Sequence, residues 1–209
     1  MTVRSAMGLG EEQGWRNLVQ LDPEDVCRRS LATFDSKSLK YTLRILKADY
    51  SVVLREKVIR PVEQNESLLP EFKDDFRIMV LDYLVNSKNI PLSGKLVAGA
   101  QLKTGEFFFR GTHGLELDPL AKAFGDDPGR FKSVGILLGG KLVDLGDVSI
   151  QLQVLPRVPI TYVLWAADEE FPARISVLFD STADSHMHLD TLRTAVTTTN
   201  RSLLPTRLG

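Results

Sequence analysis

The sequence of 209 residues is poor in the side chains that most often build covalent, redox and metal centres. Its single cysteine, Cys27, excludes a disulfide within the chain and any thiolate-rich zinc or iron–sulfur site made by this chain alone. Neither a Gly-x-Ser-x-Gly motif nor a His-Glu-x-x-His motif occurs in it. The sequence therefore indicates neither a nucleophile-elbow hydrolase nor a zincin-type metalloprotease.

An excess of charge of one sign is missing as well, and so are long apolar runs. The 26 basic and 27 acidic residues give a formal net charge of −1, without the basic excess that is usual in nucleic-acid-binding proteins. No segment approaches the roughly 18 apolar residues of a membrane-spanning helix, and the N-terminus does not resemble a secretory signal. We therefore expect a cytoplasmic protein that binds neither nucleic acid nor membranes.

The pattern of the residues that are present favours antiparallel strands. Apolar and polar residues alternate with a period of two in several segments that short turns separate, as in half-buried strands joined into hairpins. Because hairpins outnumber strand–helix–strand units, we expect an α+β fold with a mainly antiparallel sheet. The predicted strands are 39–45, 50–54, 96–102, 106–110, 148–154, 160–165 and 175–179, the third and fourth being joined by a turn at Thr104-Gly105.

About five helices are expected to pack on this sheet. Three of them should begin at Asp-Pro pairs, because aspartate accepts hydrogen bonds from free amides at a helix start and proline fits the first turn. Apolar residues at helical spacing predict two more, at 71–87 and about 189–203. We expect residues 1–14 to form a flexible tail and residues 15–204 to form a single domain. The three pairs are Asp22-Pro23, Asp118-Pro119 and Asp127-Pro128.

The most distinctive segment is PITYVLWAADEEFPARISVLFD, residues 159–180. Two alternating strands flank a turn whose polar residues are Asp168, Glu169 and Glu170. Carboxylates at the end of a hairpin are commonly only solvated, whereas acid–base catalysis requires a partner group and an apolar wall beside them. Trp165 and Phe171 are the candidates for such a wall.

The three histidines and two arginines supply the remaining candidate chemistry. His186 and His188 can share one face of an extended segment and bind a metal ion, or they can be ordinary surface residues. His113, between glycines, and the nearby Arg110 either contact a ligand or belong to a turn. Arg157, in the segment Leu-Pro-Arg-Val-Pro, is either held toward a carboxylate or phosphate or marks the end of a strand.

Several segments of the chain, taken together, carry a family resemblance. They are DDFRIMVLDYL, FRGTHGL, LGG with GD, LPRVPITYVLWAADEEFPARISVLFD and HLDTL. The chain resembles, over most of residues 25–200, an uncharacterised prokaryotic family with a domain of unknown function, found chiefly in anaerobes. Some members of that family resemble fusions to a four-cysteine iron–sulfur module of the corrinoid-protein type, which this sequence does not contain. The resemblance implies a link to corrinoid or one-carbon metabolism and no particular catalytic residues.

Two classes of function follow from these observations. The first is a small-ligand-binding or accessory protein, for a tetrapyrrole, a corrinoid or another small molecule, or for a redox or one-carbon protein partner. The second is an enzyme of hydrolase or lyase type, with the carboxylates of 168–170 and a histidine, His113 or His186, as acid and base. A purely structural interaction domain is a third alternative. Candidate ligand contacts are Arg110, His113, Arg157, Trp165 and Phe171.

Overall fold

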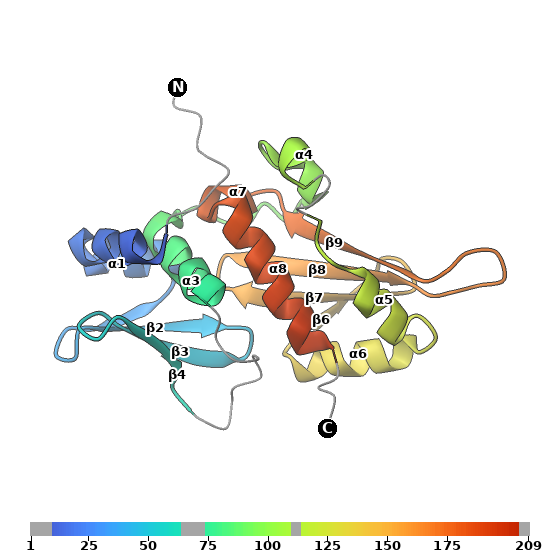
Figure 1. Cartoon of the computed structure of the whole chain (residues 1–209), viewed down its shortest axis with the longest axis horizontal. Coiled ribbons are helices and arrows are strands. Elements are labelled where there is room, and N and C mark those ends of the chain that lie inside the picture. Colours follow the sequence, from blue (N-terminus) through green and yellow to red (C-terminus); the bar gives the residue numbers. More distant parts are fainter. Residues whose placement is uncertain (1–9, 64–73, 110–113, 205–209) are drawn as a thin grey trace.

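The computed structural model describes residues 10–63, 74–109 and 114–204 and contains two antiparallel sheets (Figure 1). The α+β class and the antiparallel pairing are confirmed, with two sheets where one was expected. The first sheet has its strands in sequential order: β1 (Thr33–Asp35), β2 (Lys40–Ile45), β3 (Ala48–Val53) and β4 (Val58–Pro61). The second has the order β5-β9-β8-β7-β6, with β5 (Leu96–Ala98), β6 (Lys141–Val143), β7 (Val148–Leu155), β8 (Val158–Trp165) and β9 (Arg174–Asp180).

Helices lie around both sheets. The longest described helix packs on β8, where the Tyr162 hydroxyl donates a hydrogen bond to Oδ1 of Asn200 at 2.8 Å. Within the described ranges, no helix combines the length and the apolar character needed to cross a membrane. The helices are α1 (Glu11–Gln20), α2 (Pro23–Ser30), α3 (Asp74–Asn86), α4 (Gly105–Phe108), α5 (Asp118–Phe124), α6 (Pro128–Leu137), α7 (Ala183–His186) and α8 (Leu189–Leu203).

All three Asp-Pro pairs begin helices as predicted, but the aspartates have two different roles. Asp22 precedes α2 and accepts a hydrogen bond from the Glu24 amide at 3.2 Å. Asp127 precedes α6 and accepts one from the Arg130 amide at 2.9 Å. Asp118 is instead the first residue of α5, which has no side-chain cap. Two of the pairs therefore cap their helices, and the third only marks a helix start.

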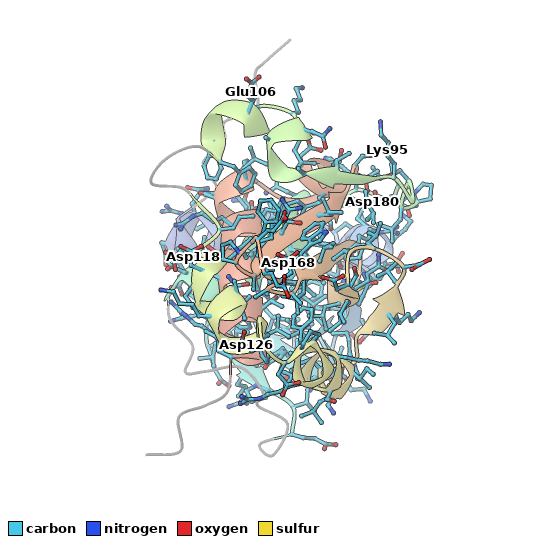
Figure 2. The ribbon with its side chains drawn as sticks, turned by 90° about the vertical axis from the view of Figure 1, so that its right-hand side faces the viewer. Lys95, Glu106, Asp118, Asp126, Asp168 and Asp180 are labelled. Atoms are coloured by element: carbon cyan, nitrogen blue, oxygen red, sulfur yellow. The ribbon has the colours of Figure 1, made fainter. Side chains whose placement is uncertain are left out.

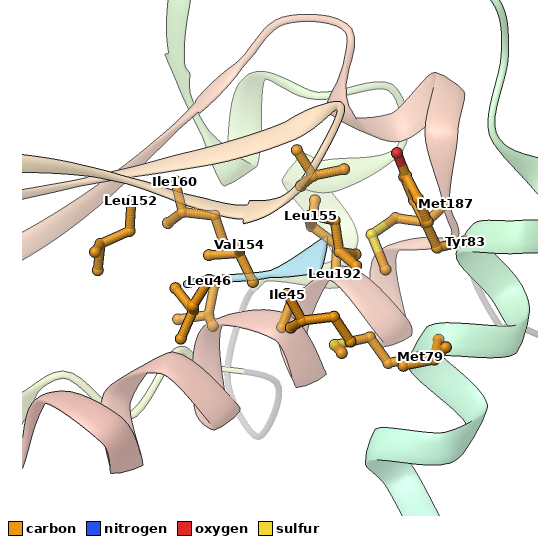
Figure 3. Packing of buried hydrophobic residues seen from close by; sticks show 14 of the residues in the cluster. Ile45, Leu46, Met79, Tyr83, Leu152, Val154, Leu155, Ile160, Met187 and Leu192 are labelled. Atoms are coloured by element: carbon orange, nitrogen blue, oxygen red, sulfur yellow. The ribbon is translucent and has the colours of Figure 1, made fainter. Parts of the chain in front are cut away.

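The two sheets share one hydrophobic core. Side chains of β7 and β8 pack against Ile45 and Leu46, at the end of β2, and against α3 (Figure 3). The Leu46 amide also donates a hydrogen bond to the Val154 carbonyl at 3.1 Å, which joins the first sheet to the second. One buried cluster contains residues of both sheets. The assignment of residues 15–204 to a single domain stays a prediction.

The predicted strand pair at 96–102 and 106–110 is wrong for the described residues beyond Ala98, that is, up to Phe109. β5 is short and pairs with β9, and the chain then forms a 3-10 turn at Gly99–Gln101 followed by helix α4. A Cβ on Gly105 would lie 1.9 Å from the carbonyl oxygen of Gly99, so glycine allows the chain to fold back closely here. Phe109 then stacks on Phe179 of β9, with 6.2 Å between ring centroids. The Phe109 ring therefore packs on the second sheet, and residues 105–108 form a helix and not a strand.

The prediction of a flexible tail over residues 1–14 is wrong for its last four residues, since α1 begins at Glu11. The glycine in this segment serves close packing: a Cβ on Gly14 would lie 3.0 Å from Cβ of Leu81 in α3. Trp15 is buried, and its Nε1 donates a hydrogen bond to Glu11 at 3.0 Å. Contacts with α3 therefore order a segment whose glycine content suggested flexibility.

Candidate functional site

The 166–173 loop joins β8 to β9 and extends beyond the end of the second sheet (Figure 1). At its tip, the Asp168 carboxylate accepts hydrogen bonds from the backbone amides of Glu170 and Phe171, at 2.9 and 2.7 Å. These bonds hold the pKa of Asp168 below its ordinary value, so the carboxylate is ionised at neutral pH. The tip is thus an exposed hairpin end with a fixed negative charge.

A pocket of about 590 Å³ opens beside this loop, and we call it the Trp165 pocket. Its volume lies in the range of sites that hold small molecules, roughly 300–1,000 Å³. The half-buried Trp165 forms part of the wall, and the guanidinium carbon of Arg174 lies 4.3 Å from the centroid of the Trp165 ring. Phe171 also lines the pocket and is 66% exposed, although such large apolar side chains are usually buried. Asp147 and Asp168 contribute carboxylates to the lining.

A second pocket, of about 440 Å³, lies between the same loop and α5, and we call it the α5 pocket. The two pockets share Pro172 and Ala173, so they are neighbours. A Cβ on Gly125, the residue after α5, would lie 2.3 Å from Cβ of Ala173, which shows how closely the loop approaches α5. Figure 2 views this end of the molecule, with Asp118 and Asp126 of the α5 pocket to one side of Asp168.

The two histidines of the predicted metal site are held by different partners. His186 ends α7, its side chain is fully buried, and its Nδ1 accepts a hydrogen bond from the Lys88 amide at 3.3 Å. Nδ1 of His188 lies 2.6 Å from Oδ1 of Asp82. Among the residues that the structure describes, no group of three or more His, Cys, Asp or Glu side chains is arranged to hold a metal ion. The structure therefore adds no further ligand to the His186–His188 hypothesis.

Asp82, which the sequence analysis did not single out, is the centre of a buried polar cluster. Its fully buried carboxylate accepts hydrogen bonds from the His188 amide at 2.9 Å, the Thr191 hydroxyl at 2.5 Å and the Asn86 side chain at 2.8 Å. Burial raises the pKa of Asp82, but the hydrogen bonds from His188 and Thr191 outweigh it and hold the pKa below its ordinary value. Because His188 and Thr191 lie at the start of α8, Asp82 caps that helix from α3. The signal in the sequence is one aspartate inside the apolar segment 79–85.

Arg157 lies in the turn between β7 and β8, where the sequence predicted a rigid connection. Its guanidinium donates hydrogen bonds to the carbonyls of Arg29 at 2.5 Å, Ile90 at 2.7 Å and Arg28 at 3.3 Å, and to the Asn89 side chain at 2.9 Å. The hypothesis that it faces a carboxylate or phosphate is not supported by these contacts. Arg157 lines neither pocket and instead joins the β7–β8 turn to the end of α2.

The structure brings together only some of the candidate residues. Trp165, Phe171 and Asp168 line one pocket, whereas Glu169 and Glu170 line neither of the two. The other ligand candidates, Arg110 and His113, lie outside the described residues. The sequence analysis did not single out Asp147 or Arg174. That Arg174 is the cross-strand partner of Trp165 can be recognised only when the register of β8 and β9 is known.

Comparison with known proteins identifies the family of the chain and nothing further. No curated protein and no solved structure matches the chain. Residues 22–201 match the model of a domain of unknown function, DUF3786, and this range contains both pockets and the buried cluster around Asp82. Since the match covers most of the 209 residues, the chain belongs to the DUF3786 family.

Proposed function

We propose that this chain is a small-ligand-binding or accessory protein and that its ligand occupies the Trp165 pocket. The observation that carries the proposal is a pocket of about 590 Å³ whose lining includes a half-buried indole and a phenyl ring that is 66% exposed. Aromatic walls with a few polar groups at the edge are typical of sites for small molecules. Flat ligands gain most from such walls, because they stack on the ring faces.

The family resemblance adds a tetrapyrrole or corrinoid as a ligand class, and a redox or one-carbon protein as a partner. Both remain within this proposal. No histidine is among the described residues that line the Trp165 pocket, so a metal-containing macrocycle bound there relies on stacking and not on an imidazole ligand from that lining. Phe171, on the exposed tip, is the side chain that we expect a protein partner to cover.

The alternative of a hydrolase or lyase has less support. It requires an imidazole beside the carboxylates of residues 168–170. Neither pocket lining contains a described histidine, and His186 and His188 lie beyond the opposite end of β9 from this loop. We therefore prefer binding over catalysis for the 166–173 loop.

The pair of tryptophans makes the proposal testable. Trp15 is 1% exposed and donates to Glu11, so its indole signal serves as an internal reference for that of Trp165. The experiment measures the absorbance and the native mass of protein purified under anaerobic conditions. The protein is then titrated with haemin and with cobinamide. Binding should quench Trp165 fluorescence and shift its indole N–H resonance, with the quenching lost in Trp165→Phe. Protein that carries no additional mass, and whose Trp165 responds to no flat probe of any charge, contradicts the proposal.

A further inference from the structure

We infer that the ligand of the Trp165 pocket is a small, flat organic cation, such as an N-alkylated or protonated nitrogen heterocycle. The inference rests on the proposed function and narrows its ligand to a small, positively charged heterocycle in place of a macrocycle. It follows from the charges that line the pocket and from the way in which each is already used.

The two carboxylates of the pocket have no cationic partner within the part of the chain that the structure describes. Oδ2 of Asp147 accepts a hydrogen bond from the Ala166 amide at 2.8 Å, and Oδ1 of Asp168 accepts from two loop amides. Neither aspartate forms an ion pair with Arg174 or with another described residue. Among the described residues, no side-chain hydrogen bond uses Oδ1 of Asp147 or Oδ2 of Asp168, so both oxygens can accept from a positively charged ligand.

The Trp165 ring already attracts a cation from within the chain. Arg174 is the cross-strand partner of Trp165 in the β8–β9 register, and its guanidinium lies over the indole at 4.3 Å. The face of an indole attracts cations through the quadrupole of the ring, and the attraction strengthens as the cation loses water. A cationic heterocycle gains that attraction when it displaces the Arg174 guanidinium from Trp165, or it stacks on Phe171 instead. The carboxylates of Asp147 and Asp168 then balance its charge.

An anionic ligand fits the same lining less well. The only described cation of the lining is Arg174, which is already stacked on Trp165, against two aspartates. An anion in this pocket would share the lining with Asp147 and Asp168, whose negative charges oppose its binding. Arg174 therefore competes with a cationic ligand for the indole, whereas it would be the main contact of an anionic one.

Three probes of similar size and different charge test the inference. They are 1-methylquinolinium, its neutral isostere 1-methylnaphthalene and the anion 1-naphthoate, each titrated while the indole N–H signals of Trp165 and Trp15 are followed. We expect 1-methylquinolinium to bind most tightly, with Trp165 shifted and Trp15 unchanged.

Variants of the lining separate charge from shape. Asp147→Asn and Asp168→Asn each keep an oxygen that accepts the backbone amide, and each should weaken binding of the cation about two- to five-fold without affecting the neutral probe. Arg174→Ala should tighten binding of the cation, because it removes a competing positive charge from the indole. Asp144→Asn, on an exposed residue outside the pocket lining, is the matched control.

The outcomes distinguish this inference from the proposed function. If the neutral isostere binds as tightly as the cation and the Asn variants change nothing, the cationic class is wrong and the pocket stands as a ligand site. If 1-naphthoate binds most tightly and Arg174→Ala abolishes its binding, the ligand is an anion. If none of the three probes shifts Trp165 while haemin or cobinamide quenches its fluorescence, the small cationic class is wrong and the pocket stands as a ligand site. If haemin and cobinamide have no effect either, the proposed function itself fails.

Discussion

Asp180 illustrates how single polar residues are used in this protein. The carboxylate, 2% exposed at the end of β9, accepts hydrogen bonds from the Ser93 and Gly94 amides and from the Thr182 hydroxyl. Burial raises the pKa of Asp180, but the hydrogen bonds from Thr182 and Ser93 outweigh it and lower the pKa to about 2. A buried carboxylate is tolerated here because loops distant in sequence supply its donors.

His186 should make the stability of the protein depend on pH. Burial and the positive charge of Arg157 lower its pKa to about 4, with Asp180 acting in the opposite direction. The unfolded chain takes up this proton near pH 6.5 and the folded protein only near pH 4, so stability is full above pH 6.5 and falls as the pH decreases toward 4. We expect this residue to account for a loss of at most roughly 3 kcal/mol.

The measurement is urea unfolding between pH 7.5 and pH 4, for the wild type and for His186→Asn. The Oδ1 of asparagine takes the place of Nδ1 as the acceptor for the Lys88 amide but does not titrate in this range. We expect the difference between the two proteins to change steadily across this interval. Parallel curves would show that His186 is not the titrating group.

At the scale of helices and strands, some helices begin at a side-chain cap and others, such as α5, begin without one. Asp22 and Asp127 accept amide hydrogen bonds outside their helices, whereas Asp118 is the first residue inside α5. α8 has no cap from its own N-cap side chain and takes one from Asp82 of α3. A cap from the residue just before a helix can be predicted from the sequence, whereas a cap supplied by a second helix cannot.

The different roles of the Asp-Pro pairs predict different effects of the same substitution. Asp127→Ala removes the hydrogen bond to the Arg130 amide and should reduce the free energy of unfolding by about 1 kcal/mol. Asp118→Ala removes no cap and should change stability by less than roughly half of that. Urea denaturation midpoints of both variants test this, and equal losses would contradict the assignment of roles.

At the scale of the whole molecule, the placement of the two sheets depends on a few contacts between them. Leu46 donates a backbone hydrogen bond to Val154 of β7, and the surrounding apolar side chains form one core (Figure 3). Arg157 adds hydrogen bonds from the β7–β8 turn to the carbonyls at the end of α2, the helix that leads into β1. Its planar guanidinium reaches several acceptors at once, which a single ammonium group does not.

Arg157→Lys should therefore destabilise the whole fold although the charge is kept. The variant leaves partly buried carbonyls without donors, and we expect a loss of roughly 2–4 kcal/mol in the free energy of unfolding. The exposed Arg60 of β4 provides the control, since Arg60→Lys should change stability by less than about 0.5 kcal/mol. Urea unfolding of both variants is the measurement, and an unaffected Arg157→Lys protein would show that these hydrogen bonds are not needed.

Much of the fold is predictable because its signals are local. The 159–180 hairpin, the β2–β3 hairpin and the helices at the Asp-Pro pairs follow from alternation, spacing and capping within about ten residues. The candidate site is predictable only in part. The sequence indicated Trp165, Phe171 and Asp168 as candidates, whereas the pairing of the strands is needed to place Arg174 and Asp147 beside them. The lining residues that were not predicted are therefore the ones whose place depends on strand register.

The sequence by itself determined which segments become strands and helices wherever a short pattern satisfies its own backbone hydrogen bonds. Only the tertiary structure decided that Glu11–Gly14 are helical, that Gly105–Phe108 form α4 instead of a strand, and that Asp82 caps α8. The physical reason is the same in each case. Burial against a distant element fixes the conformation and the partners of these residues, and no local pattern encodes which element that is.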